Sequence, residues 1–427
     1  MKFFERAFAP LIVTATVPLL CSCSIIGLKR QVTKLEQRGT IGVVLYTPPG
    51  RSFPTYAFAW THDQSGALAS VGFQTVGDIG IAPFNLLTSH KYGIAVFTDV
   101  NRSGKYERGE PLAYQENVRP SPFTDPNTPL QVVSLALARS HRELPEAVTN
   151  RPAENRALGT ALRASLGEVA SPEDERFNKQ KGSAGMWRPC DFLSESTLGI
   201  YFTESYDPDR IPVLFVHGIG GTPQDFRYMM ENFDRTRYQL WFFHYPSAVR
   251  LGRVSGAMAK GLQILHTRLG FKECYIVAHS MGGLVSANSL QELNKAGGTN
   301  FVTRFITIST PFGGHEAAAL GVRHLSKPVP SWIDVAPRSA FLQGLEQTPL
   351  PLGTRYDLIY GDTGKHDGVV SVASQLEPHN RAKAATVTRF ALGHEQILNE
   401  ATVVNRILGC LGAEKPKVPP TSIALRD

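Results

Sequence analysis

Cysteine is scarce in this chain, with five residues among 427. Cys21 and Cys23 stand near the N-terminus, which leaves Cys190, Cys274 and Cys410 in the remainder. This odd remainder gives no disulfide framework, although Cys190 and Cys410 could pair in an oxidising compartment. A small cross-linked domain is therefore excluded, and the hydrophobic content of 42% fits a globular protein with an ordinary core.

Concentrated positive charge is also missing. The net charge of +7 is spread along the chain, and no basic stripe alternates with aromatic residues. This distribution argues against nucleic acid as a partner, whereas attraction to an anionic membrane surface stays open.

The length of 427 residues suggests two to three domains. Short alternating runs punctuated by glycine and proline predict a small β-sandwich-like domain over 39–138. Residues 139–198 form a connector, helical over Arg142–Leu166 and polar after it. From residue 199 to 411 strands and helices alternate, which predicts an α/β domain with a mostly parallel sheet. Residues 412–427 are expected to be a disordered tail.

The N-terminus carries a targeting pattern rather than structure. Residues 1–22 have a short apolar core, Ala9–Leu20, which is too short to span a bilayer comfortably. The stretch Leu20-Cys-Ser-Cys23 resembles a bacterial lipobox, so we expect a lipid on Cys23 and a polar tether over 24–37. Ser24 resembles the pattern sorted to the outer membrane of the cell envelope. Ordinary secretion and an uncleaved anchor are the alternatives.

One loop in the β region has the oxygen spacing of a calcium site. Its sequence fits D-x-N-x-S-G-x5-E, which lets a chain wrap a hard cation. The candidate ligand positions are Asp99, Asn101, Ser103, Lys105, Glu107 and Glu110. Arg102, Lys105 and Arg108 weaken the local field, and no helices flank the loop, so a solvated turn without metal is the alternative.

The stretch Glu273–Leu284 organises the second half of the chain. It reads ECYIVAHSMGGL, a β-forming run followed by a turn and an amphipathic stretch, Leu284–Leu293. Ser280 stands at the apex, with Ala278 and Gly282 where larger side chains would collide. This A-x-S-x-G pattern predicts a nucleophilic serine on a strained strand-to-helix turn; an ordinary βα turn is the alternative.

A serine of this kind needs an acid and then a histidine further along the chain. Asp367 and His394 each follow a predicted strand, and the carboxyl ends of neighbouring parallel strands share one edge of a sheet. His394 is the predicted general base for Ser280, and Asp367 the acid that orients it. Asp362 competes for the acid role, but directly follows a strand and fits a turn.

Three other histidines compete with His394 for the role of base. His279 points the wrong way round the turn, His366 fits a solvated loop, and His217 precedes the serine in the chain. The loop that His217 opens reads HGIGG, whose glycines allow a substrate carbonyl to approach the backbone. We therefore predict that the N–H groups of Ile219 and Met281 form an oxyanion hole. A phosphate loop is disfavoured, because the G-K-[ST] ending is absent.

Taken together, these motifs resemble the α/β-hydrolase superfamily, in its lipase and esterase branch. They are HGIGG at 217–221, AHSMGG at 278–283, STPFGG at 309–314, DGVV at 367–370 and GHE at 393–395. STPFGG is similar to segments of bacterial lipases and of GPI inositol-deacylase-like hydrolases. The resemblance implies a Ser280, Asp367 and His394 triad, oxyanion donors at Ile219 and Met281, and no cofactor for catalysis.

Residues 315–352 are rich in apolar positions and have the place of a lid over the serine; ordinary packing is the alternative. With the lipid anchor, such a lid favours lipid or acylglycerol esters as substrates. The sequence thus predicts a membrane-tethered serine esterase or lipase. An acyltransferase or thioesterase with the same triad remains open, as does a non-catalytic surface lipoprotein.

Overall fold

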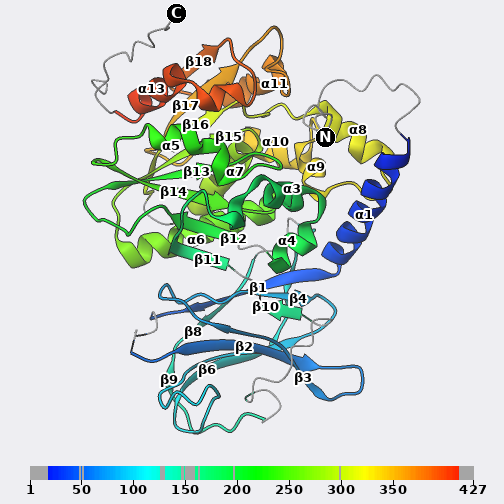
Figure 1. Cartoon of the computed structure of the whole chain (residues 1–427), viewed down its shortest axis with the longest axis vertical. Coiled ribbons are helices and arrows are strands. Elements are labelled where there is room, and N and C mark those ends of the chain that lie inside the picture. The colour runs from blue at the N-terminus through cyan, green and yellow to red at the C-terminus, as the bar shows by residue number, and fades with distance from the viewer. Residues whose placement is uncertain are drawn as a thin grey trace, which may run out of the picture.

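Alternating apolar residues near the N-terminus build a β domain, and near-continuous apolar strands further on build an α/β domain (Figure 1). The computed structural model describes residues 18–47, 50, 52–125, 130–145, 149, 159–161, 164–195, 198–297 and 300–412. The β domain lies at one end of the molecule, and the helix α1 (Pro18–Glu36) runs along the side of the α/β domain.

The β domain consists of two five-stranded sheets. One has the order β10 (Gly159–Ala161), β4 (Phe84–Leu87), β1 (Arg38–Leu45) and β7 (Ser121–Pro122), with β8 (Gln131–Leu135) also paired to β1. The other has the order β3 (Leu68–Thr75), β2 (Thr55–His62), β5 (Tyr92–Thr98), β6 (Pro111–Val118) and β9 (Ala138–Arg139). Side chains at alternate positions of β1, among them Ile41, Val43 and Leu45, are buried in the core of this domain. The predicted β-rich N-terminal region is confirmed.

The α/β domain is built on one eight-stranded sheet. Its strands are, in spatial order, β11 (Ala164–Val169), β12 (Leu198–Phe202), β14 (Tyr238–His244), β13 (Ile211–Val216), β15 (Cys274–His279), β16 (Val302–Ile308), β17 (Arg355–Gly361) and β18 (Thr386–Phe390). Neighbours are parallel except for β12 and β14, so the predicted, mostly parallel sheet is confirmed.

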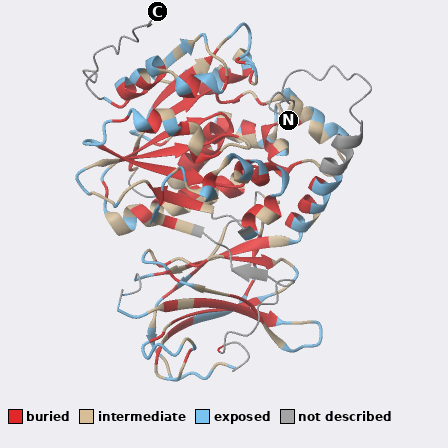
Figure 2. Cartoon of the chain, in the orientation of Figure 1, coloured by how far each residue is buried: buried red, intermediate tan, exposed pale blue. Residues whose placement is uncertain are grey.

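Helices cover both faces of this sheet. Leu214 and Val216 of β13 pack with α6 (Leu251–Leu269) and α7 (Met281–Lys295) on one face. Val213 and Phe215 of the same strand pack with α5 (Arg227–Glu231), η3 (Gln396–Asn399) and α13 (Ala401–Cys410) on the other. Burial on both faces explains why the central strands read as unbroken apolar runs (Figure 2).

Of the predicted helix over Arg142–Leu166, Thr149 is helical, and residues 146–148, 150–158, 162 and 163 lie outside the described residues. The prediction is wrong for the end of that range, where β10 and the start of β11 pair with β4 and β12 respectively. Its Ala, Leu, Arg and Glu content favours a helix, but pairing along the edge of an existing sheet outweighs that propensity. The rest of the connector forms η1 (Glu175–Phe177), α3 (Lys179–Trp187) and α4 (Pro189–Glu195).

The polar tether expected over 24–37 is also wrong, because those residues continue the helix α1 to Glu36. Leu28, Val32 and Leu35 are buried at helical spacing, and Gln31 hydrogen-bonds to the backbone and side chain of Asp191 in α4. Cys23 falls within α1, and residues 1–17 of the predicted signal peptide lie outside the described residues. In the part of the chain that the structure describes, no helix combines the length and apolarity that crossing a bilayer requires.

The predicted lid, 315–352, forms α8 (Glu316–His324), α9 (Pro330–Val335) and α10 (Ala340–Gln347). A buried ion pair joins these three helices, called the cap below, to the sheet domain. Both oxygens of Asp334 accept from Nε of Arg250 at 3.0 Å, and Oδ1 accepts from Nη2 at 2.7 Å. Asp334 also accepts the N–H of Leu251 at 2.7 Å, at the first turn of α6. The remaining helices are α11 (Val372–Gln375) and α12 (Pro378–Lys383).

Breaking this pair should destabilise the fold. Asp334 is 1% exposed, so Asp334→Ala leaves the Arg250 charge without its partner and should lower the free energy of unfolding by about 3 kcal/mol. Glu292→Ala, which breaks the exposed pair with Lys295, is the control and should cost less than about 1 kcal/mol. Urea denaturation measures both; equal costs would contradict the role given to Asp334.

Candidate active site

Ser280 occupies a strained turn between β15 and α7. Its backbone angles are φ 54° and ψ −130°, a region that residues with a Cβ rarely adopt. The turn is held from behind, because the N–H of Ser280 donates to the carbonyl of Ile308 at 2.8 Å. The side chain is 5% exposed. The sequence prediction of a serine on a tight strand-to-helix turn is thus matched by the backbone itself.

The residues after the serine must be small because the turn packs directly against neighbouring strands. A Cβ on Gly282 would lie 2.3 Å from the carbonyl oxygen of Val216, and one on Gly283 would lie 2.0 Å from Oγ1 of Thr310. Neither contact is physically allowed, so both glycines are required for α7 to approach β13 and β16.

The loop after β13 lies against the serine. A Cβ on Gly218 would come within 2.9 Å of the Cβ of Ser280 and 3.3 Å of its Oγ. Ile219 follows in this loop, and Met281 is the first residue of α7, where backbone N–H groups are free of helical partners. Ser247 fixes the loop from the other side: its Oγ accepts the N–H of Gly220 at 2.9 Å.

Asp367 and His394 meet beyond the ends of β17 and β18. Nδ1 of His394 lies 2.7 Å from Oδ2 of Asp367, with the two residues 9% and 2% exposed. Oδ1 of Asp367 accepts the N–H groups of Val369 at 2.9 Å and Val370 at 2.7 Å. Burial raises the pKa of Asp367, but the bond and charge of His394 and these N–H groups outweigh it and hold that pKa below its ordinary value.

Several groups that sequence analysis missed hold the acid loop in place. The side chain of Gln375 accepts from the N–H of Gly361 and donates to the carbonyls of Gly361 and Val370, at 3.0 to 3.1 Å. Nε2 of His315 lies 2.9 Å from the carbonyl of Val369. These are contacts between side chains and a distant backbone, so no local sequence pattern signals them.

The competing residues have other partners. Asp362 accepts from Nε of Arg389 at 2.7 Å and from the N–H of Gly364 at 2.8 Å, in a turn. His366 is exposed and accepts the N–H of Gly368. His279 is buried, and its Nε2 lies 2.9 Å from the carbonyl of His394, beside that ring rather than beside the acid.

Histidine burial also fixes protonation around the site. His217 is 1% exposed; its Nδ1 lies 2.9 Å from the carbonyl of Gly218, and its Nε2 accepts the N–H of Tyr245 at 3.4 Å. Burial lowers the pKa of His217 to about 4. Burial, together with the nearby charge of His394, lowers the pKa of His279 to about 3. Both rings are therefore neutral at neutral pH.

The calcium-like loop closes on itself. Asp99 is 1% exposed and accepts the N–H groups of Ser103 at 2.9 Å and Gly104 at 2.8 Å. Glu110 accepts the N–H groups of Val100 and Glu107, while Asn101 donates to Glu107 at 2.7 Å. Nζ of Lys105 lies 3.9 Å from Oε1 of Glu107. Oxygens of Asp99, Glu107 and Glu110 are thus engaged within the loop, and calcium binding stays a prediction.

Cys190, Cys274 and Cys410 are free and buried, so Cys190 and Cys410 do not form the disulfide considered from the sequence. Cys190 lies in α4, where its Sγ contacts the carbonyl of Gln31 in α1 at 3.4 Å, while Cys410 ends α13. Burial raises the pKa of both thiols to about 11, which leaves them protonated and unreactive at neutral pH.

The buried histidines predict loss of stability in mild acid. Because the folded pKa values of His217 and His279 lie below the unfolded value of about 6.5, the unfolded chain binds more protons, and the free energy of unfolding should fall as the pH drops from 6.5 to 4. The slope should reach about 1.4 kcal/mol per pH unit for each histidine. The lowered pKa of Asp367 acts in the same direction, but only below pH 4.

Urea denaturation between pH 4 and pH 7 measures this slope. His217→Gln removes one titrating ring, so its slope should be shallower than that of the wild type, whatever its absolute stability. The exposed His366→Gln is the matched control and should keep the wild-type slope. A free energy of unfolding that is flat over this range would contradict the assignment of neutral buried rings.

Comparison with known proteins gives a family match and similar solved structures. Residues 211–343 match the family model described as the alpha/beta hydrolase fold. No curated protein matches the chain. Similar solved structures include the mature form of Bacillus licheniformis lipase BlEst2, with 19% identity, 49% of this chain and 95% of that chain covered, and a TM-score of 0.39. Aspergillus fumigatus lipase B has 17% identity, 52% and 57% coverage, and a TM-score of 0.40. Over residues 211–343, the second domain of this chain is therefore similar to proteins of the alpha/beta hydrolase fold.

Proposed function

We propose that this protein is a serine hydrolase that cleaves carboxylic esters through an acyl-enzyme on Ser280. The observation that carries the proposal is the 2.7 Å contact between His394 and a buried Asp367, on the same edge of the sheet as a serine held at positive φ. An imidazole with Nδ1 bonded to a carboxylate presents Nε2 as a base, which is the arrangement that activates a serine hydroxyl.

The reaction follows from the protons that these groups can hold. Nε2 of His394 takes the hydroxyl proton as Oγ of Ser280 attacks the ester carbonyl carbon, and the carbonyl oxygen becomes an oxyanion. The N–H groups of Ile219 and Met281 donate to that oxyanion. When the carbonyl re-forms, the bond to the alcohol breaks, His394 returns its proton to the alcohol, and an acyl-enzyme remains. A water molecule, deprotonated by His394, then releases the acid and restores Ser280.

Asp367 acts without taking up the proton. Its pKa is held below the ordinary value, so it stays ionised when His394 becomes an imidazolium and stabilises that charge. The N–H groups of Val369 and Val370 bind its other oxygen, which leaves Oδ2 aimed at the ring. The histidine is thereby kept in the tautomer that has a free lone pair on Nε2.

Lipid or acylglycerol esters are the proposed substrates, on a protein anchored through a lipid on Cys23 to the cell envelope, at the outer membrane. The proposal of an apolar substrate is supported by residues 315–352, because Leu320 of α8 and Ile333 of α9 are exposed there. The loop 99–110 is proposed as an accessory calcium site, and the chemistry above uses no metal or cofactor.

Labelling with a fluorophosphonate probe tests the proposed nucleophile. We expect a single adduct on Ser280 by peptide mass spectrometry, and a loss of labelling in His394→Ala because the hydroxyl is then no longer activated. Asp367→Asn should lower kcat for a p-nitrophenyl ester about 10⁴-fold.

His366→Ala changes an exposed histidine of the neighbouring loop and should retain labelling and turnover. Unchanged turnover in Ser280→Ala would contradict the mechanism. A folded protein that neither labels nor turns over esters, with or without lipid vesicles, would instead favour a non-catalytic scaffold. Transfer of the acyl group to an added alcohol in preference to water would indicate an acyltransferase.

Ser247 should matter for the rate through the oxyanion loop. It is 1% exposed and accepts the N–H of Gly220, next to the proposed donor Ile219. Ser247→Ala removes this anchor, so kcat should fall about tenfold with little change in KM, because the loop is needed most when the oxyanion forms. Ser194→Ala in α4 removes a comparable hydroxyl contact with a backbone carbonyl and should leave kcat unchanged. An unchanged kcat in Ser247→Ala would contradict this role.

A further inference from the structure

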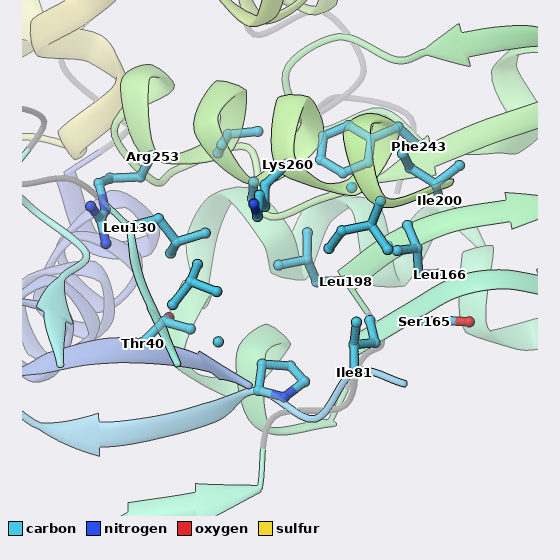
Figure 3. Close-up of a pocket in the computed structure, with 18 of the residues that line it drawn as sticks. Thr40, Ile81, Leu130, Ser165, Leu166, Leu198, Ile200, Phe243, Arg253 and Lys260 are labelled. Atoms are coloured by element: carbon cyan, nitrogen blue, oxygen red, sulfur yellow. The ribbon is translucent and has the colours of Figure 1, made fainter. Parts of the chain in front are cut away.

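An apolar cavity lies between the two domains, and neither Ser280, Asp367 nor His394 lines it. Its volume is about 140 Å³. Figure 3 shows its walls: Thr40 and Leu130 come from the β domain, while Leu198 and Ile200 come from β12 of the large sheet. The helix α6 closes the cavity from a third direction.

The wall that the β domain contributes is apolar, although this surface would face water if the β domain stood alone. In β1 the side chains of Ile41 and Val43 are buried, while the alternate positions Gly42 and Val44 are only half-buried and line the cavity. Val132 of β8 lies beside them. A solvent-facing sheet surface usually carries polar residues, so this surface is adapted to an apolar neighbour.

The described residues of the α/β domain do not fill all of the space next to this apolar surface. A Cβ on Gly42 would meet nothing closer than 3.6 Å, so a larger side chain would fit there. Along α6, Ala257 and Gly261 line the cavity one turn apart. Gly261 is small because a Cβ there would lie 3.2 Å from Ile200 and Leu166, whereas Ala257 borders the space that remains open, although protein interiors are normally close-packed.

Two cationic side chains on α6 border the cavity, and they differ in their hydrogen-bond partners. Arg253 is buried, and its Nη2 donates to the carbonyl of Ser121 at 3.2 Å. Lys260, two turns further along the helix, is half-buried, and its Nζ lies 3.4 Å from the neutral Oε1 of Gln263. No carboxylate of the described residues forms an ion pair with Lys260. In Figure 3 this lysine extends from α6 between Leu130 and Leu198.

We propose that the cavity binds the alkyl chain of a fatty-acid anion, with its carboxylate paired to Lys260. The volume of the cavity is close to that of an engineered 150 Å³ cavity that binds benzene, a molecule of six carbons, so it holds a chain end of about that length. An alkyl chain matches the apolar walls, and a carboxylate matches a lysine without an ion pair. The ligand would contact both domains at once and hold them together. This inference does not depend on the proposed ester hydrolysis.

Octanoate tests the proposal directly. Calorimetry on the full chain should give one site, and Lys260→Gln should weaken octanoate binding at least tenfold while changing the affinity for octanol less than twofold. Lys272→Gln, which changes a cation outside the cavity, is the matched control and should bind octanoate like the wild type. No octanoate binding to the wild type, or equal binding by Lys260→Gln, would overturn the proposal.

Filling variants and a photoreactive probe locate the site. Ala257→Phe and Val132→Phe fill the cavity from opposite domains, and each should weaken octanoate binding at least tenfold, whereas Thr267→Phe on the exposed side of α6 should not. Two filling variants keep the test valid if one of them fails to fold. Octanoic acid with a terminal diazirine should label peptides that contain Val132, Leu198 or Ile264. Labelling of the Ser280 and His394 peptides instead would overturn the assignment.

Discussion

The hydrogen bond between His394 and Asp367 is the contact on which the candidate site depends. It is short, buried, and joins loops that leave neighbouring strands, β17 and β18. A second bond reinforces it, because the N–H of His394 donates to the carbonyl of Asp367 at 2.8 Å. Backbone and side chain are thus fixed by the same pair of residues, so the ring has little freedom to turn away from the acid.

This pair is only as rigid as the loop behind it. The residues after Asp367 form a turn whose N–H groups bind the carboxylate, and Gln375 and His315 hold the carbonyls of that turn. His315 stands at the start of α8, so the acid loop and the cap share a support. Any movement of residues 315–352 that displaces α8 would therefore also displace the loop that holds Asp367. The loops are held in place because they leave a rigid sheet that is buried on both faces.

The residues of the candidate active site are predictable because they follow local rules. A serine with small neighbours after an apolar run requires a tight turn, and Asp367 and His394 stand where parallel strands deliver their ends to one edge. The edge strand β11 was not predictable, since pairing with β12 is decided by tertiary contact and not by the composition of residues 164–169. The spacing of Leu28, Val32 and Leu35 is that of a helix, so the sequence does predict α1, and the prediction of a polar tether did not take this spacing into account. Ser247 and Gln375 leave no sequence signal, because each bonds to a backbone group brought near only by folding.

We propose that this pair makes Ser280 a nucleophile which carries the acyl group. The most direct measurement is an acid quench during turnover of a short-chain p-nitrophenyl ester, followed by peptide mass spectrometry of the full chain. We expect an acyl group on the peptide that contains Ser280, formed at the rate of the first release of p-nitrophenol. Turnover of the ester with no acyl group on Ser280 at any time point would contradict it.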